Sequence, residues 1–352
     1  MKMWCIAITV SLIWTSLALG AEKDLGRENR LLIRASGQKI YMAIIKSDLS
    51  FRIVDLFPGL QANEVSVNQR GAAWFLLKTQ EHTATLFIER MNALSGPALQ
   101  GSTLPDSASP PAAADISHAA LSPDGKLLCG LSGGRIVVIE LDRGVVETVY
   151  GQRNVSLSPP AWAPDSSSVA FYCADHNVGS NDNFSVMIAT RTNGTWRERV
   201  VAPPSLEIGR TGKFRPRAPC WAPAGDRLVF VAHYGTDEKG PQTYSVCTNG
   251  ESLLRISGDA GDVYTPHPLI DAVTYAQVDQ GGCYIYNFAG KKETKICDAP
   301  LVFPKLSSDG KLIAMCDADG NVYVIRVDDQ KQVLLIPHAF AVNEPRYYWI
   351  KP

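Results

Sequence analysis

The pentapeptide at residues 130–134, Gly-Leu-Ser-Gly-Gly, matches the G-x-S-x-G pattern that carries the nucleophilic serine of many hydrolases, with Ser132 at the nucleophile position. That chemistry needs the serine on a sharp turn between a strand and a helix, because the start of the helix helps to form the oxyanion hole. The segment after Gly134 reads Arg-Ile-Val-Val-Ile-Glu-Leu, which is typical of a strand and has no helical period. We therefore expect a hairpin turn here and assign no catalytic residue.

A second set of polar residues has the chemistry to bind an anion. Arginine guanidinium groups match carboxylates in shape and charge. The segment 191–217 holds seven basic residues against two acidic ones, Glu198 and Glu207. The candidate ligand-binding residues are His176, His233, Tyr264, His267, Arg215 and Arg217. If they converge on one rim, they predict recognition of an acidic protein segment or an anionic glycan; the alternative is a set of solvated loop residues that never meet.

The sequence indicates neither a metal site nor a cofactor. No two of these three histidines have the close spacing that is typical of a metal centre. The segment from Asp317 to Asn321 matches the start of an EF-hand loop, but Arg326 stands where that loop needs a glutamate. We expect a polar hairpin turn there, with Gly320 at positive φ.

The elements that must position these residues follow a repeat. The stretch LSPDGKLLCGLSGGRIVVIEL from Leu121 recurs as LSSDGKLIAMCDADGNVYVIRV from Leu306, and more loosely from Trp162 and Trp221. Each copy predicts a short strand, a Pro-Asp-Gly type turn, an apolar strand, a second turn and an alternating strand. With two diverged copies added, the turn anchors lie 40 to 59 residues apart, a range typical of propeller blades; they are Asn68, Pro123, Pro164, Pro223, Pro268 and Ser308.

The two ends of the chain predict how the ring closes. Residues 31–46 align without a gap on residues 127–142, so the amino end begins at the second strand of a blade. The carboxyl-terminal segment 346–352 resembles the isolated first strand around Trp221. We therefore predict an all-β propeller of seven four-stranded blades, the last closed by strands from both termini. Six blades are the alternative, but they leave both ends unexplained.

These repeats resemble a known family. The S-P-D-G-K and W-A-P-D motifs, each followed by an apolar strand, and the D-x-D-G-N turn are similar to the WD40-like (PD40) repeats of TolB-like β-propellers. The resemblance covers repeats throughout residues 21–352 and implies the propeller fold. It departs from TolB because the repeat pattern begins by Leu31, which leaves no amino-terminal α/β domain, and because more blades are predicted. A role in Tol translocation is therefore not carried over.

Residues 1–20 have a basic start, an apolar run and small residues before Ala21, which is typical of a cleaved secretory signal. A membrane anchor is the alternative, but polar residues interrupt the run. We expect residues 21–352 to form a single propeller domain that is exported, periplasmic or secreted, and not inserted in a membrane after cleavage. The net charge of -1 argues against general electrostatic binding to nucleic acid.

Seven cysteines follow the leader, namely Cys129, Cys173, Cys220, Cys247, Cys283, Cys297 and Cys316. An odd count without a C-x-x-C spacing predicts neither a zinc cluster nor a complete disulfide framework. At most one or two disulfides are expected, and the sequence alone does not choose the pairs.

Two classes of function follow from these observations. The first is a non-enzymatic propeller that binds a protein or an anionic glycan through a loop-rich face, where the insertions 174–183 and 233–242 would emerge. Occupation of the whole chain by repeats and the failed catalytic motif favour it. The second is an enzyme at the channel mouth, a lyase or hydrolase that acts on acidic sugars through histidine and arginine.

Overall fold

The computed structural model describes the strands of each repeat and many of the turns between them. The described residues are 29–35, 39–55, 64–67, 73–80, 83–90, 100–103, 116–175, 184–203, 218–232, 234, 242–257, 261–267, 269–277, 282–298, 301–340 and 346–350. The predicted signal, residues 1–20, lies outside them. Within these ranges the chain is all-β, and no helix in them is long and apolar enough to cross a membrane.

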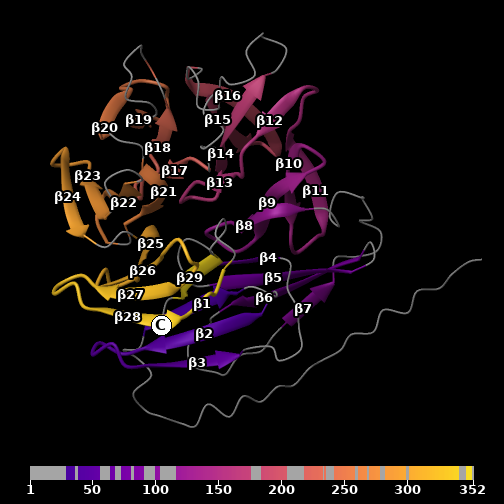
Figure 1. Cartoon of the computed structure of the whole chain (residues 1–352). Helices are drawn as coiled ribbons and strands as arrows, with labels where there is room; N and C mark the ends of the chain where they lie inside the picture. The colour runs from indigo at the N-terminus through magenta and orange to yellow at the C-terminus, as the bar shows by residue number, and fades with distance from the viewer. Residues whose placement is uncertain are drawn as a thin grey trace, which may run out of the picture.

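The described strands form seven antiparallel sheets, the blades (Figure 1). The first four along the chain are β4 (Glu64–Val67), β5 (Ala73–Gln80), β6 (Thr83–Arg90) and β7 (Gln100–Thr103); β8 (Ser117–Leu121), β9 (Leu127–Ser132), β10 (Arg135–Glu140) and β11 (Val145–Tyr150); β12 (Val155–Leu157), β13 (Ala161–Trp162), β14 (Ser168–Asp175), β15 (Phe184–Thr192) and β16 (Thr195–Ala202); and β17 (Cys220–Trp221), β18 (Arg227–Ala232), β19 (Gln242–Cys247) and β20 (Leu254–Ser257).

Three further blades complete the set. They are β21 (Gly261–Pro266), β22 (Ala272–Gln277), β23 (Cys283–Asn287) and β24 (Lys292–Cys297); β25 (Val302–Leu306), β26 (Leu312–Cys316), β27 (Val322–Arg326) and β28 (Gln332–Ile336); and β29 (Arg346–Ile350) with β1 (Asn29–Arg34), β2 (Ile40–Ile45) and β3 (Phe51–Asp55). The innermost strands contact one another in a closed cycle, in the order β29, β4, β8, β13, β17, β21, β25 and back to β29. The fold is therefore a β-propeller.

The predicted closure is present in the last of these sheets, where the carboxyl-terminal β29 pairs with the amino-terminal β1. The two strands run antiparallel, with Leu31 opposite Trp349, and β2 and β3 continue the sheet outward. Asn29 Nδ2 donates to Asp309 Oδ2 at 3.5 Å, and Arg326 Nη1 donates to the Ser47 carbonyl at 2.8 Å. Both contacts tie the closing blade to the β25–β28 blade.

The predicted Pro-Asp-Gly turns join the first and second strands of the blades. In the β8–β9 turn, Ser122 Oγ donates to Asp124 Oδ1 at 2.6 Å and accepts from the Leu127 amide at 2.9 Å. Ser307, Asp309 and Leu312 repeat this arrangement in the β25–β26 turn. The side chains satisfy backbone groups that the turn leaves without ladder partners, which is why these residue types recur.

Two ends of each blade can now be distinguished. The turn end carries the connections between the first and second strands. The loop-rich end is the opposite one, where the second strand leads into the third and where the chain enters the first strand. The connections from β14 to β15 and from β18 to β19 fall within the predicted insertions 174–183 and 233–242, so these insertions leave from the loop-rich end. The insertions are shorter than predicted, because Ala174 and Asp175 belong to β14 and Gln242 belongs to β19.

Tryptophan side chains join successive blades. Trp162 Nε1 donates to the Ala120 carbonyl at 2.9 Å, and Trp221 Nε1 donates to the Ala161 carbonyl at 2.9 Å. Trp349 repeats the contact with the Lys305 carbonyl at 2.6 Å. Each indole thus pairs with the same position of the preceding blade's first strand. The apolar core lies between the blades in the same way, since its clusters combine residues of two adjacent sheets.

A bulge recurs between the third and fourth strands. The register shifts at the same place in five of the described sheets, after the pairs Ile136 and Tyr150, Val186 and Ala202, Thr243 and Ser257, Cys283 and Cys297, and Val322 and Ile336. All five pairs lie at the loop-rich end. A bulge increases local twist, so its repetition gives the outer edge of these blades a common shape.

Candidate functional site

Most of the predicted anion-binding residues lie outside the described part of the chain. This applies to His176, His233, Arg215 and Arg217, and for Tyr264 the description covers the backbone of β21 but not the side chain. The connections that carry His176 and His233 leave from the loop-rich end, as noted above. Their convergence stays a prediction.

His267 lies at the turn end of its blade. The sequence predicts it at the channel mouth, on the loop-rich side together with His233. It begins the turn between β21 and β22, at the opposite end of that sheet from the β22–β23 connection. It occupies the position of Ser122, since each residue's amide donates to the carbonyl five residues on, and its Nδ1 accepts from the Leu269 amide at 3.2 Å within the turn. Burial lowers the pKa of His267. A turn cap therefore accounts for this histidine, and we leave it out of the anion site.

Ser132 lies in a tight hairpin, as the sequence predicts. It ends β9 and is opposite Arg135, the first residue of β10, so that Gly133 and Gly134 form a two-residue turn. Their φ values of 55° and 73° are those that such a turn requires. No helix follows, so the nucleophile arrangement is missing.

A cleft of about 370 Å³ opens at the loop-rich end between the β8–β11 blade and β12. It is lined by Ser117, Leu131, Ser132, Gly133, Gly134, Val155, Ser156 and Leu157. Three hydroxyl groups and the glycine backbone supply hydrogen-bonding groups, and the leucines and valine supply apolar walls. None of these lining residues is an acid or a base. The cleft thus has the chemistry to hold a hydroxyl-rich or amide-rich ligand.

Two arginines adjoin the cleft in sequence. Arg135 follows the lining residue Gly134, and Arg153 lies two residues before the lining residue Val155; both are exposed. A Cβ atom on Gly151 would lie 2.6 Å from Arg135 Cγ, so this glycine leaves room for the arginine stem. These two arginines are not among the predicted residues, because they lie outside the longer insertions. The signal that points to them is the G-x-S-x-G motif, whose residues line the cleft.

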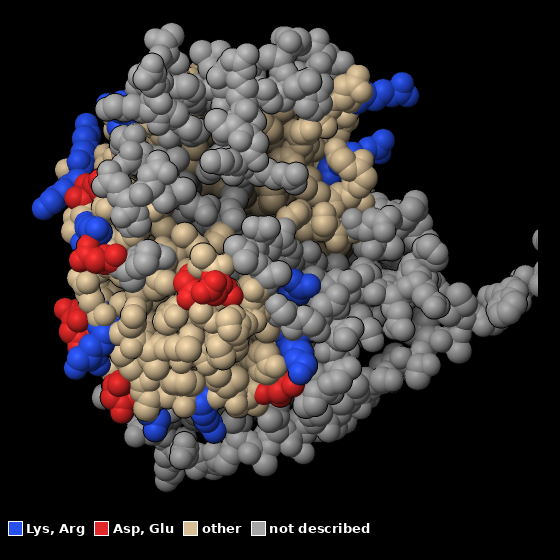
Figure 2. Space-filling view, viewed as in Figure 1, with Lys and Arg blue, Asp and Glu red and all other residues tan. Residues whose placement is uncertain are grey.

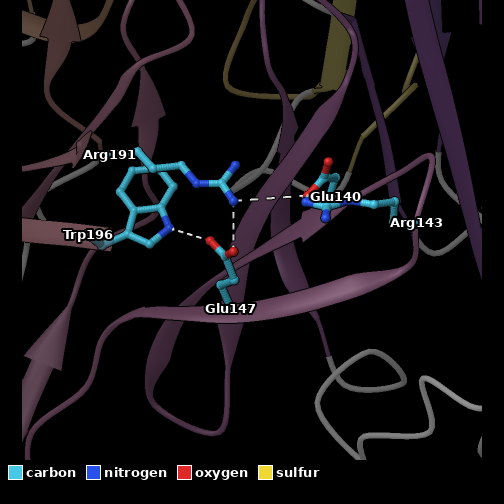
Figure 3. A network of polar contacts seen from close by, with 5 residues as sticks. All are labelled: Glu140, Arg143, Glu147, Arg191 and Trp196. Carbon is cyan, nitrogen blue, oxygen red and sulfur yellow. Dashed lines mark hydrogen bonds and ion pairs between the residues drawn. The ribbon is translucent and has the colours of Figure 1, made fainter. Parts of the chain in front are cut away.

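The same two blades are joined at the turn end by a polar network (Figure 3). Arg191 Nη2 donates to Glu147 Oε1 at 2.7 Å and lies 4.0 Å from Glu140 Oε2, while Trp196 Nε1 donates to Glu147 Oε2 at 2.8 Å. The hydrogen bond from Arg143 lowers the pKa of Glu140. Two cationic and two anionic groups balance in this cluster. It is therefore a joint that fixes the blades flanking the cleft rather than an anion site.

The described surface shows no broad region of one sign on the face in view (Figure 2). Blue and red side chains alternate along its left edge, beside the blades of β21–β24 and β25–β28, and along its lower edge, beside β2 and β3. Among the described residues, no three histidine, cysteine or acidic side chains gather as a metal site would require. Binding on this face would therefore depend on local groups rather than on a general field.

Comparison with known proteins supports the fold. No protein-family model and no curated protein matches this sequence. Oligogalacturonate lyase from Vibrio parahaemolyticus is similar in structure, with a TM-score of 0.58 and 12% identity over 90% of this chain and 86% of that one. An oligogalacturonate lyase in complex with manganese gives 0.58 and 12% identity over 89% and 85%. At this identity the likeness shows a shared β-propeller fold.

TolB from Acinetobacter baumannii also matches, with 15% identity over 75% of this chain and 68% of that one, and a TM-score of 0.43. That similarity is too low to argue from. The propeller expected from the TolB-like repeats is therefore confirmed by the sheets themselves, and membership of the PD40 repeat family stays a prediction.

Proposed function

We propose that this chain is an exported, non-enzymatic β-propeller that binds an acidic partner, an anionic glycan or a protein segment, through its loop-rich end. The cleft beside Ser132 carries the proposal. It combines hydroxyl and backbone groups with exposed Arg135 and Arg153 nearby, and it opens at the end from which the predicted histidine-bearing insertions leave.

The chemistry of these groups favours a carboxylate-bearing ligand. Guanidinium groups form charge-assisted, bidentate hydrogen bonds with carboxylates, and serine hydroxyls exchange hydrogen bonds with sugar hydroxyls or peptide groups. We include the predicted residues Arg215 and Arg217 in the same recognition rim. Because the net charge of the chain is only -1, these local arginines would be the source of selectivity.

An enzyme that acts on acidic sugars is the second candidate. Two oligogalacturonate lyase structures share the propeller fold, and one of them was determined in complex with manganese. A lyase or hydrolase here would need acid or base groups beyond the cleft lining, and His176 and His233 are the residues we would assign. Binding without turnover distinguishes the first proposal from this one.

Titration calorimetry with oligogalacturonate, and with a carboxyl-reduced oligomer of equal length, tests the binding function. We expect affinity for the acidic oligomer and little for the neutral one. Arg135→Ala and Arg153→Ala should each weaken binding about tenfold, the loss of one charge-assisted hydrogen bond. Arg199→Ala is the matched control, since Arg199 is an exposed arginine on the outer strand β16.

The same samples separate the alternatives. Release of unsaturated or shortened product, with or without added manganese, and its loss in His233→Ala would replace the binding proposal by the enzymatic one. If neither oligomer binds, acidic peptides are titrated next. Equal affinity for acidic and neutral ligands, or no effect of any arginine variant, contradicts the proposed rim.

A further inference from the structure

Two cysteines face each other across adjacent strands of the β21–β24 blade. Cys283 begins β23, Cys297 ends β24, and the register places them directly opposite. Both are buried, at 0% and 3% exposure. None of the other five described cysteines has a cysteine partner in its strand register. The structure holds all seven as thiols.

The distance between opposite positions suits a disulfide. Directly opposed residues in antiparallel strands have Cα atoms about 4.5–5.5 Å apart, within the roughly 4.4–6.8 Å span of natural disulfides. The backbone also approaches closely at this point. A Cβ atom on Gly282 would lie 2.7 Å from the Cys297 carbonyl oxygen, so only glycine fits beside Cys283. Its φ of 95° also requires glycine.

The repeat shows what is special about this pair. Four other blades carry the same bulge, and their equivalent residues are an isoleucine with a tyrosine, a valine with an alanine, a threonine with a serine and a valine with an isoleucine. These residues lie opposite each other on the two outer strands. Only the β21–β24 blade places two thiols at that position, which gives the packing contact the chemistry to become covalent.

We propose that Cys283 and Cys297 form a disulfide that staples the loop-rich end of the β21–β24 blade. A thiolate of one cysteine attacks a disulfide oxidant and releases one thiol, and the second cysteine then attacks the mixed disulfide and releases the other. Two electrons and two protons thus pass from the cysteine pair to the oxidant, which becomes two thiols. The protein sulfurs end joined by one S–S bond.

The buried position of this disulfide determines at which stage it forms and which part of the chain it fixes. Burial, and then the neighbouring Cys297, raise the pKa of Cys283, so this thiol reacts slowly in the folded protein. Oxidation therefore belongs to folding, before the blade packs. Cys283 and Cys297 both belong to the apolar cluster shared with Leu301 and Ile313 of the next blade region. The bond would fix the chain end that leads into β25.

Refolding with and without oxidised glutathione tests the proposal. Each sample is then unfolded in denaturant and treated with iodoacetamide, which should label seven cysteines of residues 21–352 after reducing refolding and five after oxidising refolding, a difference of two labels in the mass. Trypsin cleaves after Lys291, Lys292 and Lys295, so the bond appears as two linked peptides, one with each cysteine. The thermal midpoint of the oxidised protein should be higher by roughly 2–6 °C, because a short loop is closed in the unfolded chain.

Two variants complete the design. Cys297→Ser should abolish the linked peptide and the shift in midpoint. Cys129→Ser, which replaces a buried cysteine without an opposed thiol, should keep both. Seven labels after oxidation, or a linkage between other cysteines, overturns the proposal. Because peptide mapping of the unaltered chain decides this, failure of a variant to fold does not leave the question open.

Discussion

At the scale of single residues, two glycines with similar backbone angles differ in what surrounds them. Gly134 has a φ of 73° and no atom within 4 Å of an added Cβ, whereas Gly320 has a φ of 77° and its Cβ would lie 2.1 Å from the Phe340 carbonyl oxygen. Both turns were predicted from sequence. Only the structure shows that the turn at Gly320 also packs against the chain segment at Phe340.

We expect Gly134→Ala to lower the free energy of unfolding by about 1–2 kcal/mol, the cost of a left-handed alanine. Gly320→Ala should cost clearly more, because the Phe340 segment must move as well. Denaturant unfolding of both variants measures the difference. Equal losses would mean that Phe340 does not pack on this turn.

Among single residues, those that form turns could be predicted from the sequence, but the role of His267 and the pairing of the cysteines could not. Turn chemistry is local, so Ser132 and Gly320 could be assigned from their neighbours in the chain. His267 could not, because a histidine in the place of the capping Ser122 looks like a ligand until its Nδ1 contact with Leu269 is seen. The opposition of Cys283 and Cys297 depends on a bulge that leaves no residue-type signature.

At the scale of elements, the first-strand tryptophans act as joints between blades. Trp162 is 2% exposed and its indole pairs with a backbone carbonyl of the preceding blade, whereas the indole of half-buried Trp196 pairs with a glutamate near solvent. The W-A-P motif in the sequence predicts the first strand of a blade. Its inter-blade hydrogen bond follows only from the ring arrangement.

Trp162→Phe keeps most of the apolar contact but removes the hydrogen bond to the Ala120 carbonyl of the preceding blade. We expect a loss of about 0.5–1.5 kcal/mol in the free energy of unfolding, since one buried hydrogen bond between blades is lost while Ala120 keeps its pairing with Cys129. Trp196→Phe is the control and should cost less, because water can reach Glu147. Chemical denaturation of both variants checks this order, and the reverse order would show that the joint is not the indole hydrogen bond.

At the scale of the whole molecule, closure and binding use different parts of the same ring. The turn end carries the repeated caps and the Arg191 network, while the loop-rich end carries the cleft, the insertions and the cysteine pair. The gapless match of residues 31–46 to residues 127–142 was enough to predict the seam. The placement of ligand groups was not, because loops of different length do not preserve the repeat.

The seam itself gives the last prediction. Ending the chain at residue 345 removes β29, and with it the Trp349 bond to Lys305 and the contact of Lys305 Nζ with the Tyr348 ring at 3.8 Å. It also exposes the edge of β1 and opens the cycle of inner strands. We expect a loss of about 5 kcal/mol or more, the lower range of a whole domain's stability, together with aggregation.

Ending the chain at residue 350 is the matched control, since it shortens the chain but retains all of β29. Size-exclusion chromatography with light scattering and thermal unfolding compare the two truncations. A synthetic peptide of residues 344–352, added to the chain that ends at residue 345, should bind as the missing strand beside β1. The complex should then be monomeric and unfold cooperatively. If the chain that ends at residue 345 unfolds like the control, the ring does not depend on its terminal strand, and the closure would have to reside in the Asn29 and Arg326 contacts alone.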